Sequence, residues 1–109
     1  MKTIYNNIIP VRGFKALTLY PIIFVRRDAP AMRADDYTHE YIHARQQKEM
    51  LIVGFYLWYA IEWLIKFLLF GAAAYRSLSF EQEAYTQEKD EQYLDKRKSY
   101  AWMRYVWRR

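Results

Sequence analysis

The two histidines of this chain lie four residues apart, in the sequence H-E-Y-I-H at residues 39–43. Residues i and i+4 of an α-helix project from the same face, so His39 and His43 converge on one point if the segment is helical. Glu40 then lies about 100° around the helix, beside the two imidazoles. The pattern predicts two nitrogen ligands for a metal ion and a carboxylate that takes a proton from water. A chance arrangement of polar residues on a surface helix is the alternative.

Zinc suits such ligands, and a catalytic zinc takes three protein ligands and keeps one position open. The segment S-F-E-Q-E-A-Y, residues 79–85, opens a later predicted helix and offers Glu81 and Glu83 as the third ligand. Ala84 is small enough to let this helix approach the first one closely. The residues alone leave the choice between the two glutamates open.

An H-E-x-x-H on one helix, followed by E-x-x-A on a later helix, resembles the gluzincin metallopeptidases. Thermolysin-like enzymes and membrane CAAX-type proteases share this layout. The segment H-E-Y-I-H-A-R-Q-Q also resembles small uncharacterised metallopeptidase-like proteins of bacterial type that carry H-E-x-x-H-x-x-Q-Q. The resemblance covers residues 36–50 and 79–86. It implies a minimal zincin-like core in which His39, His43 and Glu81 bind zinc and Glu40 is the general base in peptide-bond hydrolysis.

The sequence departs from this family at Tyr85, where the family often has an aspartate that steadies a zinc-bound histidine. The departure keeps Glu83 as an alternative ligand and leaves two functions open. The first is a zinc-dependent metallopeptidase whose substrate is a peptide or protein. The second is a non-catalytic zinc-containing module that acts at a membrane surface or on a partner protein.

The pattern along the chain predicts one domain over residues 1–109, mainly α with a small β part (α+β). Residues 1–27 predict a β-hairpin of two strands around a turn near Arg12 and Gly13, with Pro21 placing the second strand at an edge or breaking it. Three or so helices then occupy residues 36–109. They run from Asp36 to about Val53, from 55 to 75, and from Glu81 to about Lys98, with Asp35 or Asp36 and Ser77 or Ser79 as caps.

The helix expected at 55–75 belongs to an apolar stretch, residues 50–74, whose only charged residues are Glu62 and Lys66. Their spacing of four allows them to pair on one helical face. The stretch is long enough to cross a bilayer. Three interpretations remain open: a core helix, a helix lying at a membrane interface, and a membrane span.

The formal net charge of +5 and the C-terminal segment 96–109, which mixes basic and aromatic residues, favour an anionic membrane surface over nucleic acid as a partner. Packing of these rings on the core is the alternative. The membrane interpretation places some of four tryptophans at the headgroups and six cations against lipid: Trp58, Trp63, Trp102 and Trp107, with Lys96, Arg97, Lys98, Arg104, Arg108 and Arg109. The start of the chain lacks the apolar run of a secretory signal, so we expect a cytoplasmic or peripheral membrane location. The absence of cysteine excludes disulfides and thiolate ligands.

Overall fold

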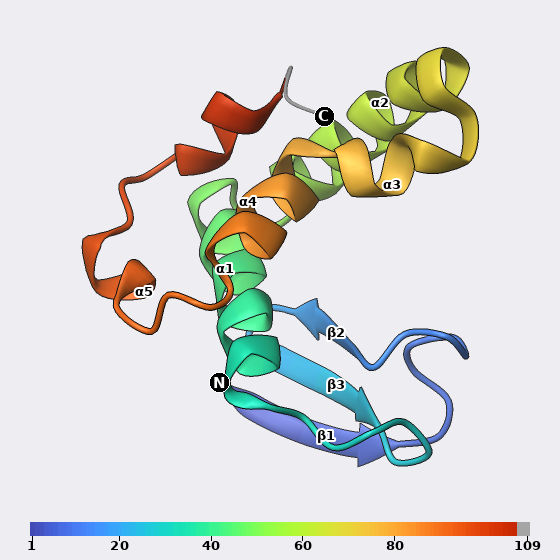
Figure 1. Cartoon of the computed structure of the whole chain (residues 1–109), viewed down its shortest axis with the longest axis vertical. Helices are drawn as coiled ribbons and strands as arrows, with labels where there is room; N and C mark the ends of the chain where they lie inside the picture. Colours follow the sequence, from blue (N-terminus) through green and yellow to red (C-terminus); the bar gives the residue numbers. More distant parts are fainter. Residues whose placement is uncertain (107–109) are drawn as a thin grey trace.

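The computed structural model describes residues 1–106 as a small sheet followed by helices (Figure 1). The three strands have the spatial order β1-β3-β2, and they are β1 (Lys2–Asn6), β2 (Ala16–Leu19) and β3 (Ile22–Arg26). The helical elements are α1 (Ala34–Glu49), α2 (Val53–Phe70), η1 (Gly71–Ala73), α3 (Ala74–Ser77), α4 (Ser79–Gln87), α5 (Tyr93–Lys96) and η2 (Ala101–Tyr105). The predicted architecture, mainly α with a small β part, is confirmed.

The sheet differs from the predicted two-stranded hairpin. β1 pairs in parallel with β3, and β2 pairs in antiparallel orientation with β3. The predicted turn at Arg12 and Gly13 is present, since the N–H of Phe14 donates to the backbone oxygen of Val11 over 3.3 Å. It does not close a hairpin, because β1 and β2 both pair with β3, and the tight turn of the antiparallel pair lies at Tyr20 and Pro21. Pro21 breaks the second apolar segment into two strands because proline has no N–H to continue the ladder.

Neither aspartate holds the predicted N-cap position of α1, and Asp36 instead contacts the helix start from the third helical position. Arg33 occupies the N-cap position, and its backbone N–H donates to Oδ2 of Asp36 over 2.9 Å. Lys15, just before β2, donates to the same oxygen over 2.7 Å. Asp36 thus satisfies one orphan N–H of the helix and holds the start of α1 to the sheet.

The break between α1 and α2 does not lie at Gly54, which is helical. It lies at Leu51 and Ile52, whose φ angles are +56° and +64°. The left-handed region is unfavourable for a β-branched residue such as Ile52. Backbone propensity therefore favours a helix break at Gly54, whereas in the packed structure the break lies at Leu51 and Ile52.

The later helices are shorter than predicted. α2 ends at Phe70, before Gly71, whose φ is +62°, and α4 ends at Gln87 instead of continuing to Lys98. Neither serine caps α4: Leu78 holds the N-cap position, and the hydroxyl of Ser79 donates to Glu62 instead. After α4 the chain turns at Asp90, whose side chain accepts the N–H of Gln92 over 2.9 Å.

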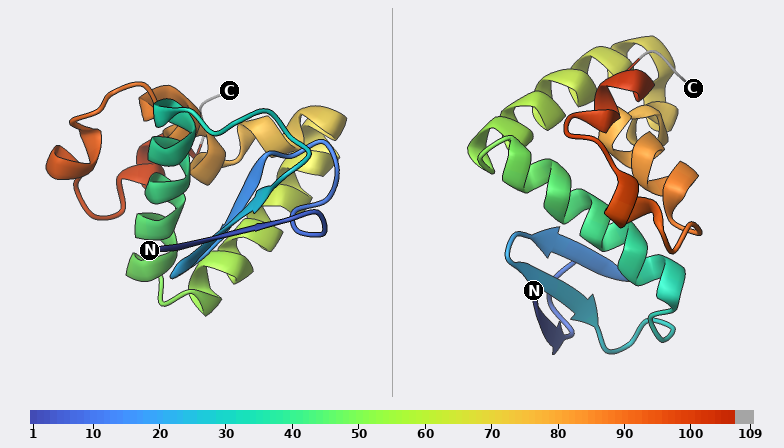
Figure 2. Two further views of the ribbon diagram at one scale, coloured as in Figure 1. Left: turned by 90° about the horizontal axis from the view of Figure 1, so that it is seen from below. Right: turned by 90° about the vertical axis from the view of Figure 1, so that its left-hand side faces the viewer.

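α1 is the central element, since it contacts β2, α2 and α4. Figure 2 shows the sheet on one side of α1 and α4 beside it. Ala84 is fully buried against Ile42 and Tyr93, so α4 approaches α1 closely, as its small side chain predicts. A second cluster, Phe55, Phe80 and Trp102, packs α2, α4 and η2 together. These contacts fix the distance between α1, which carries His39 and His43, and α4, which carries Glu81.

The core-helix interpretation of α2 is wrong, because its buried residues are only Phe55, Glu62 and Lys66. The predicted pair is present: Nζ of Lys66 lies 2.7 Å from Oε2 of Glu62. By length and composition alone, the helix that begins with α2 is long and apolar enough to cross a membrane.

The C-terminal segment packs inward at two positions where lipid contact was expected. Trp102 is buried in the core, and the side chain of Arg97 is buried in ion pairs with Glu49 and Glu83. Trp107, Arg108 and Arg109 lie outside the described residues.

Candidate metal centre

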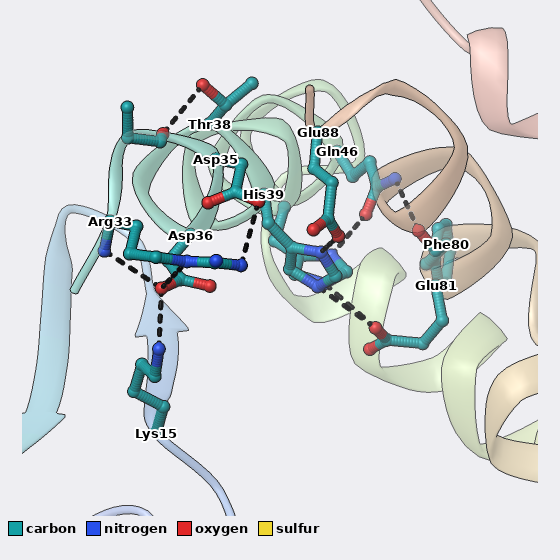
Figure 3. A network of polar contacts seen from close by, with 12 residues as sticks. Lys15, Arg33, Asp35, Asp36, Thr38, His39, Gln46, Phe80, Glu81 and Glu88 are labelled. Carbon is teal, nitrogen blue, oxygen red and sulfur yellow. Dashed lines mark hydrogen bonds and ion pairs between the residues drawn. The ribbon is translucent and has the colours of Figure 1, made fainter. Parts of the chain in front are cut away.

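Three side-chain atoms from α1 and α4 converge at the centre of the molecule. Nε2 of His43 lies 3.1 Å from Nε2 of His39 and 3.2 Å from Oε1 of Glu81. Nε2 of His39 lies 3.4 Å from the same Glu81 oxygen. The structure thus brings Glu81, of the two candidate glutamates, to the imidazoles (Figure 3).

The tautomer of His43 follows from its neighbour Gln46. The amide nitrogen of Gln46 donates to the backbone oxygen of Phe80 over 3.1 Å and to Oε1 of Glu83 over 3.0 Å. Both partners are acceptors, so the amide oxygen must be the atom that lies 2.8 Å from Nδ1 of His43. Nδ1 therefore carries the proton, and the lone pair of Nε2 is left for a ligand.

Glu88 orients His39 in the same way. Its carboxylate oxygen lies 2.9 Å from Nδ1 of His39, and a carboxylate accepts, so Nδ1 donates. Glu88 thus fixes the orientation of the His39 ring, and the resemblance assigns such a contact to an aspartate at position 85. Tyr85 instead packs its ring edge-on against the His39 ring, with centroids 4.6 Å apart.

With both Nδ1 atoms protonated, the three converging atoms are all acceptors. Three lone pairs at this spacing repel one another unless a cation, either a proton or a metal ion, lies among them. Ligands at the zinc distances of ~2.0–2.1 Å and tetrahedral angles are about 3.3 Å from one another. The observed separations of 3.1–3.4 Å match that spacing, so these side chains fit zinc.

The pKa values describe the site when a proton takes the place of the metal. Burial lowers the pKa of His43, but the Glu81 carboxylate outweighs burial and raises it to about 9. Burial raises the pKa of Glu81, but His43 and His39 together bring it down to about 2. The metal-free site is therefore an ion pair near neutral pH, and a metal must displace its proton.

Glu40 lies beside the imidazoles, as the helical spacing predicts, and is almost fully buried. The hydroxyl of Thr18 on β2 donates to Oε1 of Glu40 over 2.8 Å and is 3.1 Å from the Glu40 backbone oxygen. This contact fixes the direction of the carboxylate. Glu40 shares one cavity with His39, His43 and Glu81, where a general base must be placed.

The cavity has a volume of about 450 Å³ and is mainly apolar. The β1–β2 loop and β2 form one wall, and α2 forms another. Besides His39, Glu40, His43 and Glu81, the cavity is lined by Ile8, Ile9, Pro10, Val11, Phe14, Ala16, Leu17, Thr18, Gln47, Phe55, Tyr56, Tyr59 and Tyr75. Burial raises the pKa of Tyr75 above its ordinary value, so its hydroxyl keeps its proton and can donate to a ligand.

Glu83, the alternative ligand, is fully buried and is held by other partners. It accepts from the hydroxyl of Tyr93 over 2.7 Å and from Nε of Arg97 over 2.5 Å, as well as from Gln46. Arg97 also bonds Glu49 at the end of α1. Glu83 thus contacts the candidate metal centre through Gln46 and does not join the three converging atoms.

Gln47 connects α1 to the sheet. Its amide nitrogen donates to the backbone oxygen of Thr18, and its amide oxygen accepts from the N–H of Tyr20, both over 2.7 Å. The two adjacent glutamines of the H-E-x-x-H-x-x-Q-Q segment therefore have separate tasks. Gln46 fixes His43 to α4, and Gln47 fixes β2 beside Glu40.

Comparison with protein-family models, with curated proteins and with solved structures gives no match. The resemblance to gluzincins therefore depends on the residues and geometry described above.

Proposed function

We propose that this chain is a zinc-dependent metallopeptidase-like hydrolase of the gluzincin type. The observation that carries the proposal is the convergence of the two Nε2 atoms and Glu81 Oε1, with both Nδ1 protons already donated to Gln46 and Glu88. Three protein ligands beside a cavity are typical of a catalytic zinc, whereas a structural zinc is enclosed by four. His39, His43 and Glu81 would hold the ion.

Zinc at this position supplies Lewis acidity, which polarises a carbonyl group and makes water more acidic. Glu40 acts as the base, since it faces the cavity and Thr18 fixes its carboxylate. It takes a proton as the water oxygen bonds to the peptide carbon. It then gives this proton to the nitrogen as the carbon–nitrogen bond breaks. Tyr59 and Tyr75 line the same cavity and are the candidate donors to the oxyanion.

A peptide substrate is supported by the position of β2. β2 is an outer strand of the described sheet and carries Thr18, which contacts Glu40. Gln47 already occupies the backbone oxygen of Thr18 and the N–H of Tyr20. The part of the outer edge left for pairing therefore lies towards Ala16, which lines the cavity. An extended peptide can add to such an edge through backbone hydrogen bonds. In that position its carbonyl groups would pass the mouth of the cavity.

The experiment is zinc analysis of the full chain purified without chelator, together with a peptide-library cleavage assay read by mass spectrometry. We expect about one zinc per chain and cleavage that Glu40→Gln abolishes without loss of zinc, because Glu40 is not a ligand. Loss of zinc in His39→Ala/His43→Ala completes the test. Equal cleavage by wild type and Glu40→Gln would exclude the proposed base, and unchanged zinc in the double variant would exclude the ligands.

A non-catalytic zinc-containing module is the second candidate. The observation in its favour is the buried network from His43 through Gln46 and Glu83 to Arg97, by which the ion would fasten the C-terminal segment to α1 and α4. It predicts that zinc removal lowers stability strongly and that the protein, with its zinc bound, cleaves no member of the library.

A further inference from the structure

The helix α2 has its charges inside and its apolar residues outside. The stripe Leu57, Ile61, Leu64 and Leu68 is exposed at 61%, 59%, 54% and 76%. Trp63 and Phe67 flank it and are also exposed. Helices of water-soluble proteins have the reverse arrangement, with the apolar stripe facing the core. We refer to these six residues as the outer face of α2.

The two charged residues of α2, Glu62 and Lys66, are buried on its inner side and form hydrogen bonds there. Glu62 accepts from the N–H and hydroxyl of Ser79 over 2.6 Å each and from Nε1 of Trp58 over 2.9 Å. Lys66 pairs with Glu62 and also donates to the backbone oxygen of Ser77. The cost of burying the two charges is thus offset by hydrogen bonds, and no charged side chain of α2 faces outward.

The apolar surface continues beyond the helix and is bordered by cations. Leu51, Ile52 and Val53, in the turn before α2 and at its first residue, are exposed. Arg45 and Lys48 are exposed on the last two turns of α1, just before this turn, whereas the guanidinium of Arg76 in α3 stacks on the ring of Tyr85. An apolar face with basic residues at its border is the pattern of a helix lying on an anionic bilayer.

We propose that the outer face of α2 lies in the acyl-chain boundary of an anionic lipid bilayer, with the helix along the membrane plane. A second copy of the chain fits less well, because the central stripe has no polar side chain, whereas protein interfaces carry about one hydrogen bond per 100–200 Å². A span across the bilayer fits less well too. The α3–α4 segment follows α2 and packs on it through α3, and it exposes Arg76 and Thr86, which would enter the hydrocarbon region.

The first test is flotation of the full chain with phosphatidylcholine vesicles that contain about one third phosphatidylglycerol. The variant Leu57→Gln/Ile61→Gln/Leu68→Gln should bind at least ~10-fold more weakly, because burial of each aliphatic side chain contributes to partitioning. The matched control, Leu19→Gln/Met103→Gln, removes two exposed apolar residues from other elements and should bind like wild type. Equal loss in both variants would overturn the proposal, as would a wild-type protein that stays unbound and elutes as a dimer.

The second test does not depend on folding of the triple variant. The chain has no cysteine, so Leu68→Cys and Thr86→Cys each give a single site for an environment-sensitive fluorophore. Vesicles should shift the emission of the label at 68 to shorter wavelength and leave the label at 86 unchanged. A shift at both positions, or at neither, would contradict the proposed orientation. The variant His39→Ala/His43→Ala should still float, so the outcome is separate from that of the zinc site.

Discussion

Nδ1 of His43 lies 2.8 Å from the side-chain oxygen of Gln46, three residues further along α1. The opposite end of the same amide is held by the backbone of Phe80 and by Glu83, both on α4. One glutamine thus fixes the tautomer of His43, a proposed ligand, and the relative position of α1 and α4. Outer partners of this kind orient a histidine towards its metal.

Substitution of Gln46 should therefore weaken metal binding. In Gln46→Leu, Nδ1 of His43 and the buried Glu83 each lose a partner, and we expect zinc affinity to fall about 10–100-fold. The measurement is competition against a chromophoric chelator. Gln47→Leu is the matched control, because Gln47 contacts Thr18 and Tyr20 and no ligand. Its zinc affinity should stay within about threefold of wild type, and an equal loss in both variants would show a general effect of unfolding.

The contact of Glu88 with His39 gives a second prediction. Glu88→Ala removes the acceptor for Nδ1 of His39 and should lower zinc affinity about 10-fold. Tyr85→Phe keeps the ring that packs on His39 and should leave zinc affinity unchanged. If Tyr85→Phe has the larger effect, the tyrosine and not Glu88 compensates for the aspartate of the gluzincin pattern.

The convergence of His39 and His43 beside a glutamate of α4 could be predicted because it depends on local rules, whereas the choice of Glu81 over Glu83 depends on the gluzincin resemblance. Helical spacing places the two histidines on one face, and Ala84 permits the approach of α4. The same reasoning predicts the Glu62–Lys66 pair, which is confirmed. A spacing of three or four residues on a helix is set by backbone geometry and needs no knowledge of the rest of the fold.

The supporting residues could not be predicted in the same way. Gln46 lies at helical spacing from His43, but its role depends on two acceptors of α4 that orient its amide. Glu88 lies seven residues after Glu81, and so on the same helical face, but only the packing of α4 on α1 shows that it reaches His39. Sheet order depends on contacts between distant segments, so the sequence pattern does not predict the pairing of β1 with β3.

The contact between Thr18 and Glu40 predicts an effect on turnover without an effect on metal binding. Thr18→Val removes the hydroxyl that fixes Oε1 of Glu40 and should lower kcat about 10-fold, because the base loses its orientation. Zinc content should be unchanged. Thr38→Val is the control, since Thr38 on α1 bonds only its own helix at Ala34. Both variants are assayed on the peptide that the library identifies, and equal kcat values for them would contradict the role of Thr18.

A further prediction concerns the start of α1 and its dependence on pH. Burial raises the pKa of Asp36, but Lys15 and the N–H of Arg33 outweigh burial and hold the pKa below its ordinary value of 3.8. A carboxyl group whose pKa is lowered by folding stabilises the protein above the unfolded pKa. This contribution is lost as the pH falls through the lower folded pKa. Asp36 should therefore stabilise the protein at neutral pH and contribute nothing at strongly acidic pH.

Asp36→Asn should lower the free energy of unfolding by about 1 kcal/mol at pH 7, the usual value for the loss of a helix cap. The difference from wild type should close as the pH falls below 3.8, because the carboxyl group of wild type is then neutral as well. Urea denaturation of both metal-free proteins between pH 7 and pH 2 measures it, and the chelator removes any contribution from zinc loss. Asp35→Asn is the control, since Asp35 pairs with the largely exposed Arg33 and should change stability by less than about 0.5 kcal/mol. A difference for Asp36→Asn that persists at pH 2 would mean that the asparagine disturbs packing, and that the Lys15–Asp36 charge pair does not hold α1 to the sheet.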